Sequence, residues 1–119
     1  MIKNALRAGA YLHHLEIESE NPGALAQFYS LAMDMKLEEI SENNWLCCGT
    51  DRNILITKGE SNKLSYAAFA CHDIDGLNNI RNWAQGAELE ILESKSRCLK
   101  AGAFAVSDPD ENIICFGLA

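Results

Sequence analysis

The residues of this sequence best suited to chemistry are a histidine and a glutamate two positions apart, His14 and Glu16. Because side chains alternate between the faces of a strand, both lie on one face of the strand predicted over residues 11–18, opposite Leu15 and Ile17. A histidine has an ordinary pKa of about 6.5, so it can bind a ligand or act as a general base, with the glutamate orienting its ring. The simpler alternative is a histidine that is hydrogen-bonded within the sheet and has no chemical role.

The five cysteines do not form the pattern of a disulfide framework or a zinc site. Their number is odd, no Cys-x-x-Cys pair occurs, and several lie in apolar, strand-like segments. We interpret them as free thiols of a protein in a reducing compartment, which predicts a cytoplasmic location. The sequence also lacks a Gly-rich phosphate loop and a nucleophile elbow.

Composition limits the classes of partner. A chain of 119 residues, 48% of them hydrophobic, fits a single domain with its own core. The formal net charge is −7 at pH 7, so neither nucleic acid nor an anionic membrane surface is an expected partner. No segment has the character of a signal peptide or the length of a bilayer-spanning helix, so no targeting or membrane segment is expected.

The first half of the chain is predicted to fold as a strand, a helix and three further strands. Asn21 is a good N-cap, Pro22 is favoured at the first helical position, and apolar residues recur at helical spacing from Leu25 to Ala32. The three strands are expected at residues 37–40, 45–48 and 54–57.

The second half repeats this order. Asp73 or Asp75 can cap a helix that carries Leu77, Ile80 and Ala84 on one side. Strands are expected at residues 66–71, 89–92, 103–106 and 112–118. Since cap, helix face and turns all recur, we predict two copies of a β-α-β-β-β module, at residues 11–57 and 65–118, joined by a polar linker at 58–64.

This organisation predicts an α+β fold. Two βαβββ modules would form one curved, mostly antiparallel sheet, in which each helix covers one face of its own module. The other face would then be free to curve around a ligand.

Three segments together resemble a known superfamily. They are His14–Ser19 leading to Phe28-Tyr29, then Tyr66–Asp75, and then Phe104–Ile114 with its Asp-Pro-Asp-Glu-Asn turn, in which Glu111 stands where a Gly is usual. The pattern is similar to the vicinal oxygen chelate superfamily, which includes glyoxalase I, bleomycin resistance proteins and extradiol dioxygenases. It most resembles the N-terminal, metal-free domain of type I extradiol dioxygenases.

The resemblance implies where a metal would bind. In that superfamily four positions on the concave face hold a divalent metal, and here they correspond to His14, Ile56, Tyr66 and Cys115. An isoleucine cannot ligate, a tyrosine ligates only as a phenolate with an ordinary pKa of about 10, and a thiolate favours soft metals. We therefore expect no cofactor. His14 would be the metal ligand only if Fe, Mn, Ni or Zn bound at an atypical site.

The same positions predict a ligand cavity. Ala68 shares the face of Tyr66 and leaves volume above the sheet, so an apolar, aromatic-lined cavity is expected. Its predicted lining is His14, Trp45, Ile56, Tyr66, Ala68 and Cys115. The alternative is that these side chains fill a core or a dimer interface.

Two functions of different classes follow. The first is metal-independent binding of a small, aromatic molecule by a homodimer, as in the bleomycin resistance branch. The second is a dioxygenase- or glyoxalase-type enzyme with an atypical site or a separate catalytic subunit, in which His14 and then Glu16 would be catalytic. A structural or regulatory remnant without a ligand is a third possibility.

Overall fold

The computed structural model describes residues 9–50, 52–61 and 63–119, which form two helices and eight strands. The chain divides into two compact units. The first unit comprises residues 14–65, and the second comprises residues 66–119 together with the segment that ends at His13. Neither helix is long and apolar enough to cross a membrane.

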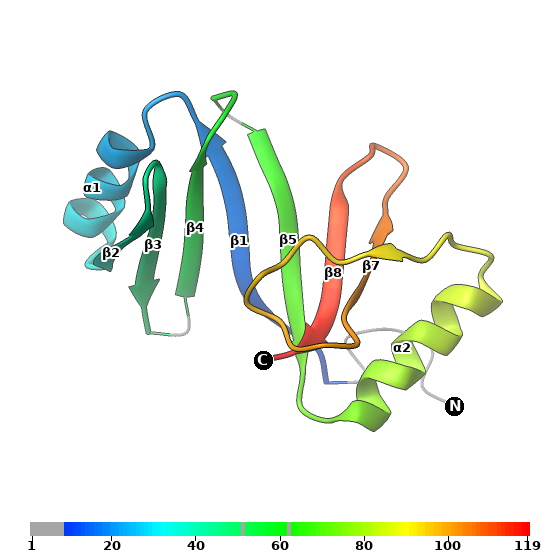
Figure 1. The fold of residues 1–119 in the computed structure, drawn as a ribbon. Helices are drawn as coiled ribbons and strands as arrows, with labels where there is room; N and C mark the ends of the chain where they lie inside the picture. The colour runs from blue at the N-terminus through cyan, green and yellow to red at the C-terminus, as the bar shows by residue number, and fades with distance from the viewer. Residues whose placement is uncertain (1–8, 51, 62) are drawn as a thin grey trace. The chain divides into compact units, whose positions relative to one another are not determined.

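The first unit contains one helix and a four-stranded sheet (Figure 1). Its elements are β1 (Tyr11–Ser19, from His14 onward), α1 (Pro22–Met33), β2 (Lys36–Ser41), β3 (Asn44–Gly49) and β4 (Arg52–Lys58). The strand order is β2-β3-β4-β1. The β1–β4 pair is parallel, whereas β2–β3 and β3–β4 are antiparallel.

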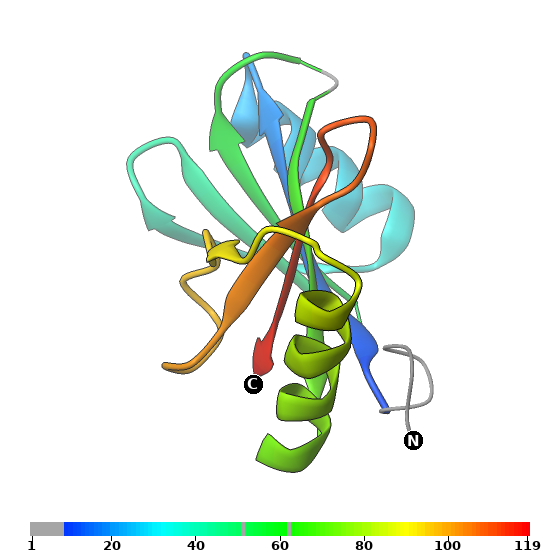
Figure 2. The ribbon, with the colours of Figure 1, turned by 90° about the vertical axis from the view of Figure 1, so that its right-hand side faces the viewer.

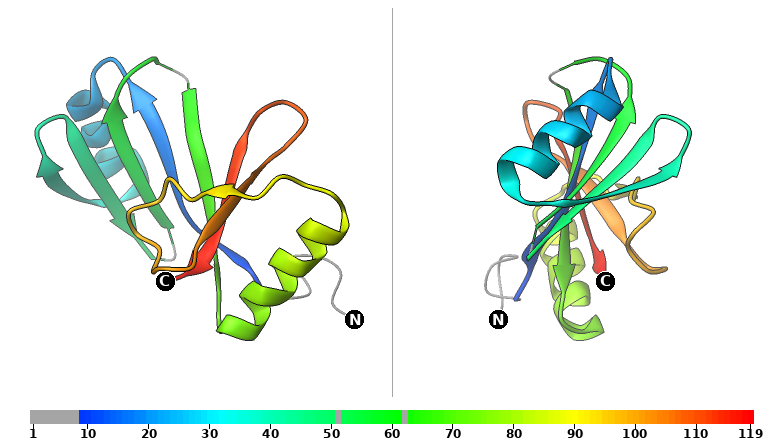
Figure 3. Two further views of the ribbon diagram at one scale, coloured as in Figure 1. Left: turned by 45° about the vertical axis from the view of Figure 1, so that its right-hand side comes forward. Right: turned by 90° about the vertical axis from the view of Figure 1, so that its left-hand side faces the viewer.

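Helix α1 begins and ends where the sequence provides caps. The side chain of Asn21 accepts a hydrogen bond from the backbone N–H of Ala24 at 3.4 Å, and Asp34 adopts a left-handed φ of 53° after the last turn. Apolar side chains of α1 and the sheet form a core that includes the buried residues Ala26, Met35 and Cys47. The helix therefore covers one face of this sheet, as the right-hand view of Figure 3 shows.

The second unit has the same order of elements. They are β5 (Lys63–Cys71, from Tyr66 onward), α2 (Ile74–Gly86), β6 (Leu92–Glu93), β7 (Phe104–Ser107) and β8 (Ile113–Leu118). The strand order is β5-β8-β7-β6, with β5–β8 parallel and the other two pairs antiparallel.

Helix α2 packs against β8 (Figure 2). The carboxylate of Asp73 caps it by accepting a hydrogen bond from the backbone N–H of Gly76 at 2.8 Å. Leu77 and Ile80 are buried against Phe104 and Phe116, whose ring centroids are 5.6 Å apart. This core lies on the helix side of the sheet.

The predicted α+β class with two β-α-β-β-β modules is confirmed. The strand expected at residues 89–92 is largely wrong, because β6 contains only Leu92 and Glu93. Glu88 turns with a φ of 63°, and the backbone N–H of Leu89 instead donates to the carbonyl of Ala84 at 3.0 Å, at the end of α2.

Candidate functional site

The strand register of the first unit separates the predicted site residues onto two faces. Ile56 is the cross-strand partner of Ile17 on β1 and of Trp45 on β3, so these three side chains share a face. Ile56 and Trp45 belong to the core beneath α1. His14 and Glu16 alternate with that row and lie on the opposite face. The expectation that His14, Trp45 and Ile56 line one cavity is therefore wrong.

The error comes from the apolar run in β4. Its residues Ile54, Leu55 and Ile56 offer an apolar side chain on both faces, so the sequence does not show which residue faces the helix. In the structure Glu16 is paired with Leu55, which is buried on the face opposite α1. Leucine, like isoleucine, cannot ligate a metal, so the corrected position has no donor either.

The polar residues on this face of β1 are held by local contacts. His14 is buried, with 2% of its surface exposed. Glu18 accepts hydrogen bonds from the hydroxyl of Ser65 at 3.1 Å and from the backbone N–H of Glu60 at 3.4 Å, and it lies 3.8 Å from the ammonium of Lys63. The carboxylate of Glu18 therefore joins β1 to Glu60, Lys63 and Ser65 at the end of the first unit.

In the second unit Tyr66, Ala68 and Cys115 do lie together, on the face opposite α2. All three are completely buried. Leu92 and Leu99 pack onto this cluster, and the segment between β6 and β7 passes over β8 (Figure 1, yellow to orange). The chain's own side chains thus occupy the volume above these residues.

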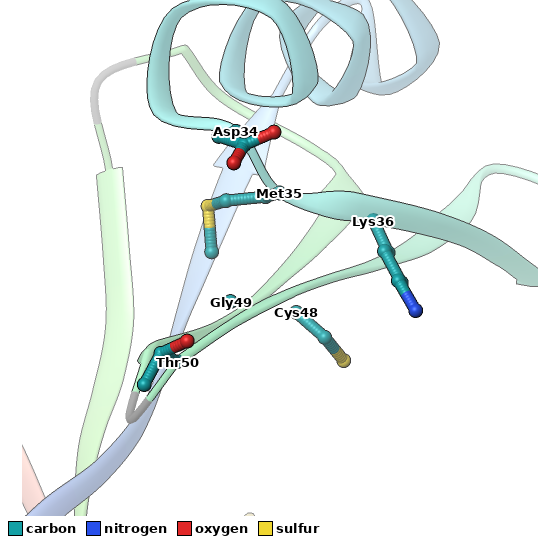
Figure 4. A pocket seen from close by; sticks show the side chains of 6 residues that line it. All are labelled: Asp34, Met35, Lys36, Cys48, Gly49 and Thr50. Atoms are coloured by element: carbon teal, nitrogen blue, oxygen red, sulfur yellow. The ribbon is translucent and has the colours of Figure 1, made fainter.

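A polar pocket of about 440 Å³ lies in the first unit (Figure 4). It is lined by Asp34, Met35, Lys36, Cys48, Gly49 and Thr50. Lys36 and Cys48 are cross-strand neighbours on β2 and β3, and their side chains point to the same side, away from that of Asp34. Apart from the buried Met35, the lining is mostly polar and is half-buried or exposed, so it offers little surface for burying an organic ligand.

An apolar pocket of about 270 Å³ lies in the second unit, between α2 and the β7–β8 hairpin. Its lining is Ile80, Trp83, Ala84, Leu89, Val106, Ser107, Asp108, Pro109, Ile114 and Phe116. Trp83 keeps 42% of its surface exposed. Sequence reasoning missed this site because Trp83 and Leu89 fall outside the buried stripe predicted for the helix. The sequence signal that could have indicated the pocket is the presence of these two large apolar residues outside the stripe.

The rim of this apolar pocket is an ordered turn. The carboxylate of Asp108 accepts hydrogen bonds from the side-chain amide of Asn112 at 3.0 Å and from the backbone N–H groups of Asn112 and Asp110, both at 2.9 Å. These bonds, with that from the Asn112 side chain foremost, lower the pKa of Asp108 and keep it ionised. Glu111 adopts a φ of 68°, the conformation for which glycine is usual in this turn.

The donor chemistry does not fit the metal of the vicinal oxygen chelate enzymes. Of the predicted positions, only His14 carries a donor that binds a divalent transition metal such as Fe, Ni or Zn in its ordinary state. Across residues 9–50, 52–61 and 63–119, no group of three His, Cys, Asp or Glu side chains is placed to hold a metal ion.

Comparisons identify the fold but not a sequence family. No protein-family model matches the sequence, and no curated protein matches it. A solved catechol 2,3-dioxygenase aligns with 92% of this chain and 40% of its own, with a TM-score of 0.76 and 15% identity. Homoprotocatechuate 2,3-dioxygenase from Brevibacterium fuscum aligns with 92% and 37%, with a TM-score of 0.73 and 16% identity.

The 2,3-dioxygenase LapB from Pseudomonas sp. KL28 also matches, over 91% of this chain and 42% of its own, with a TM-score of 0.71 and 11% identity. The chain thus spans less than half the length of these dioxygenases. Identity this low establishes a shared fold rather than a shared activity. The chain has the fold of the extradiol dioxygenases, and so a vicinal oxygen chelate-like fold.

Proposed function

We propose that this chain binds a small apolar molecule, without the metal of the dioxygenases, in the pocket between α2 and the β7–β8 hairpin. The observation that carries the proposal is the lining of this pocket. Val106, Ile114 and Phe116 supply side chains from the sheet, and Ile80 and Ala84 supply them from the helix. Apolar surface that is open to a ligand but enclosed by two elements is the usual form of a small-molecule site.

The size and charge of the pocket define the ligand class. An apolar cavity of about 150 Å³ is enough to hold a benzene molecule, and this one has about 270 Å³. One or two fused rings would fit. The carboxylate of Asp108 is the charged group of the lining, and its oxygens are engaged within the turn. A neutral ligand is therefore favoured over an anionic one, because no cation is present in the lining to pair with it.

The fold is compatible with an aromatic ligand. The similar solved structures are named as dioxygenases of catechol and of homoprotocatechuate, which are aromatic compounds. This likeness supports the ligand class only by analogy, since function depends on the site and not on the fold. Trp83 provides an aromatic side chain at the pocket mouth, where it can stack on a planar ring.

The two tryptophans allow a direct test. The indole N–H signals of Trp83 and Trp45 would be followed by NMR during titration with indole, naphthalene and, as an anionic control, benzoate. We expect the neutral probes to shift the Trp83 signal in a saturable way. The Trp45 signal, from the core beneath α1, should stay in place, and benzoate should have little effect.

A matched pair of variants completes the test. Leu89→Glu places a charge in the apolar lining and should abolish the Trp83 shift, whereas Leu12→Glu, the same change at an exposed leucine outside the pocket, should not. The proposal would be overturned by the absence of any saturable Trp83 shift, or by equal shifts in the two variants.

The second candidate function is catalysis through His14. It is suggested by the residue type and position of His14, a buried histidine on the same face of β1 as Glu16, because an imidazole can serve as a metal ligand or a general base. The test is metal content after anaerobic reconstitution with Fe(II), Mn(II), Ni(II) and Zn(II). About one retained ion per chain, lost in His14→Ala, would support an atypical metal site. A chain that retains no ion, or retains it equally in the variant, would exclude a metal site built on His14.

A further inference from the structure

The outer face of α1 is apolar and exposed. The helix contains no charged residue over its 12 positions, although the whole chain carries a net charge of −7. Phe28 is 58% exposed and Leu31, one turn later, is 88% exposed. The stripe that includes Ala26 is turned toward the core instead. A second copy of the chain could approach this face without the charge repulsion that an acidic protein otherwise meets.

Strand β2 contacts α1 and forms the edge of the sheet of the first unit. It pairs with β3 on one side. The backbone groups on the outer side of an edge strand have no ladder partner and can pair with another strand. Charged side chains on such an edge oppose pairing unless the register brings unlike charges together.

We propose that a second copy of this chain docks here, with β2 pairing antiparallel to β2 of the other copy about a two-fold axis perpendicular to the sheet. Such an axis keeps both α1 helices on the same side and brings residues of the same face opposite each other. Registers centred on Lys36, Glu38 or Glu39 would each place one of these charges directly opposite its own copy. The like charges disfavour all three registers.

The register centred on Leu37 places unlike charges opposite each other. Lys36 of each copy then lies opposite Glu38 of the other, which gives two unlike pairs. Leu37, on the helix side of the strand, meets its own copy and adds apolar contact. This register also avoids the irregularity that begins after Glu39 in the ladder with β3.

The first test is the oligomeric state across a concentration series, by sedimentation equilibrium. We expect a reversible dimer, and Leu31→Glu should raise its dissociation constant by about tenfold or more, because it places a charge in the apolar face. Ile74→Glu, the same kind of change at an exposed residue of α2, is the matched control and should have no effect. A chain that is monomeric throughout, or a dimer insensitive to Leu31→Glu, would overturn the proposal.

The second test addresses the register, and it uses exposed positions that should not disturb folding. Lys36→Glu and Glu38→Lys should each weaken the dimer, because each variant brings like charges together twice. The double variant restores both unlike pairs and should recover dimerisation. A double variant as weak as the two single variants would show that β2 does not pair in this register.

Discussion

Leu99, in the segment between β6 and β7, lies directly over Gly117 of β8. A Cβ at Gly117 would lie 3.1 Å from the Cβ and Cδ1 atoms of Leu99 and 2.8 Å from the Cβ of Ala103. Such distances are too short for carbon atoms, so Gly117→Ala should displace the segment. We expect a loss of about 1–3 kcal/mol in the free energy of unfolding, measured in urea.

Gly86 provides the control for this substitution. A Cβ at this position, the last of α2, would meet no atom within 4 Å. Gly86→Ala should therefore be neutral or stabilising, by up to about 1 kcal/mol, because alanine loses less conformational entropy in a helix. Equal destabilisation by both variants would contradict the close approach at Gly117.

The position of Ile56 predicts a purely structural role. It is completely buried in the core beneath α1. Ile56→Ala should lower the free energy of unfolding by about 2–5 kcal/mol, through the lost apolar contacts and the cavity that remains. Binding of naphthalene, read from the Trp83 signal under conditions in which the variant is folded, should not change. If the folded variant bound naphthalene more weakly than wild type, Ile56 would have to be assigned to the ligand site.

The turn at Asp108 predicts a dependence of stability on pH. Hydrogen bonds to its carboxylate lower the folded-state pKa below the unfolded value, which is about 3.9 for an aspartate. The stabilisation is therefore present above that unfolded pKa and is lost as the pH falls through the folded one. Wild type should be more stable than Asp108→Asn near neutral pH, and the difference in urea midpoint should shrink in acid. A difference that is constant with pH would contradict this linkage.

The burial of the cysteines predicts their reactivity. Cys98 is exposed and Cys48 is half-buried, whereas Cys47, Cys71 and Cys115 are buried. Burial raises the pKa of Cys47 and of Cys71, which further suppresses their thiolates. A chromogenic disulfide reagent should label two thiols in the folded protein and all five in denaturant. Cys48→Ser and Cys98→Ser should each remove one fast thiol, whereas rapid labelling of Cys47 in folded protein would be inconsistent with the structure.

Much of the fold was predictable because caps and helix faces are local signals. Asn21 and Asp73 mark the starts of the two helices, and Leu77 and Ile80 mark the buried side of the second. Their repetition in the same order gave the two modules. The end of α2 was less predictable. Glu88 adopts a left-handed conformation that favours glycine, and a glutamate at this position gives no indication of that conformation.

The candidate site was less predictable for two physical reasons. The assignment of Ile56 came from the resemblance, and an alignment error of one residue along a strand moves a side chain to the other face. Tyr66 and Cys115 lie in one buried cluster, but no sequence signal indicates that Leu99 packs onto it. The apolar pocket requires residues of α2, β7 and the following turn to meet, which is a tertiary relationship.

The parallel pairing inside each unit has a consequence for how the chain folds. The antiparallel ladder between β3 and β4 closes through a short turn, whereas the pairing of β1 with β4 must bring Ile17 to Ile56 across a helix and two strands. Closing the longer loop costs more chain entropy before its contacts form. The hairpins should therefore appear early in refolding and the parallel ladders last. In amide exchange pulsed during refolding, protection of β1 would then lag behind that of β3.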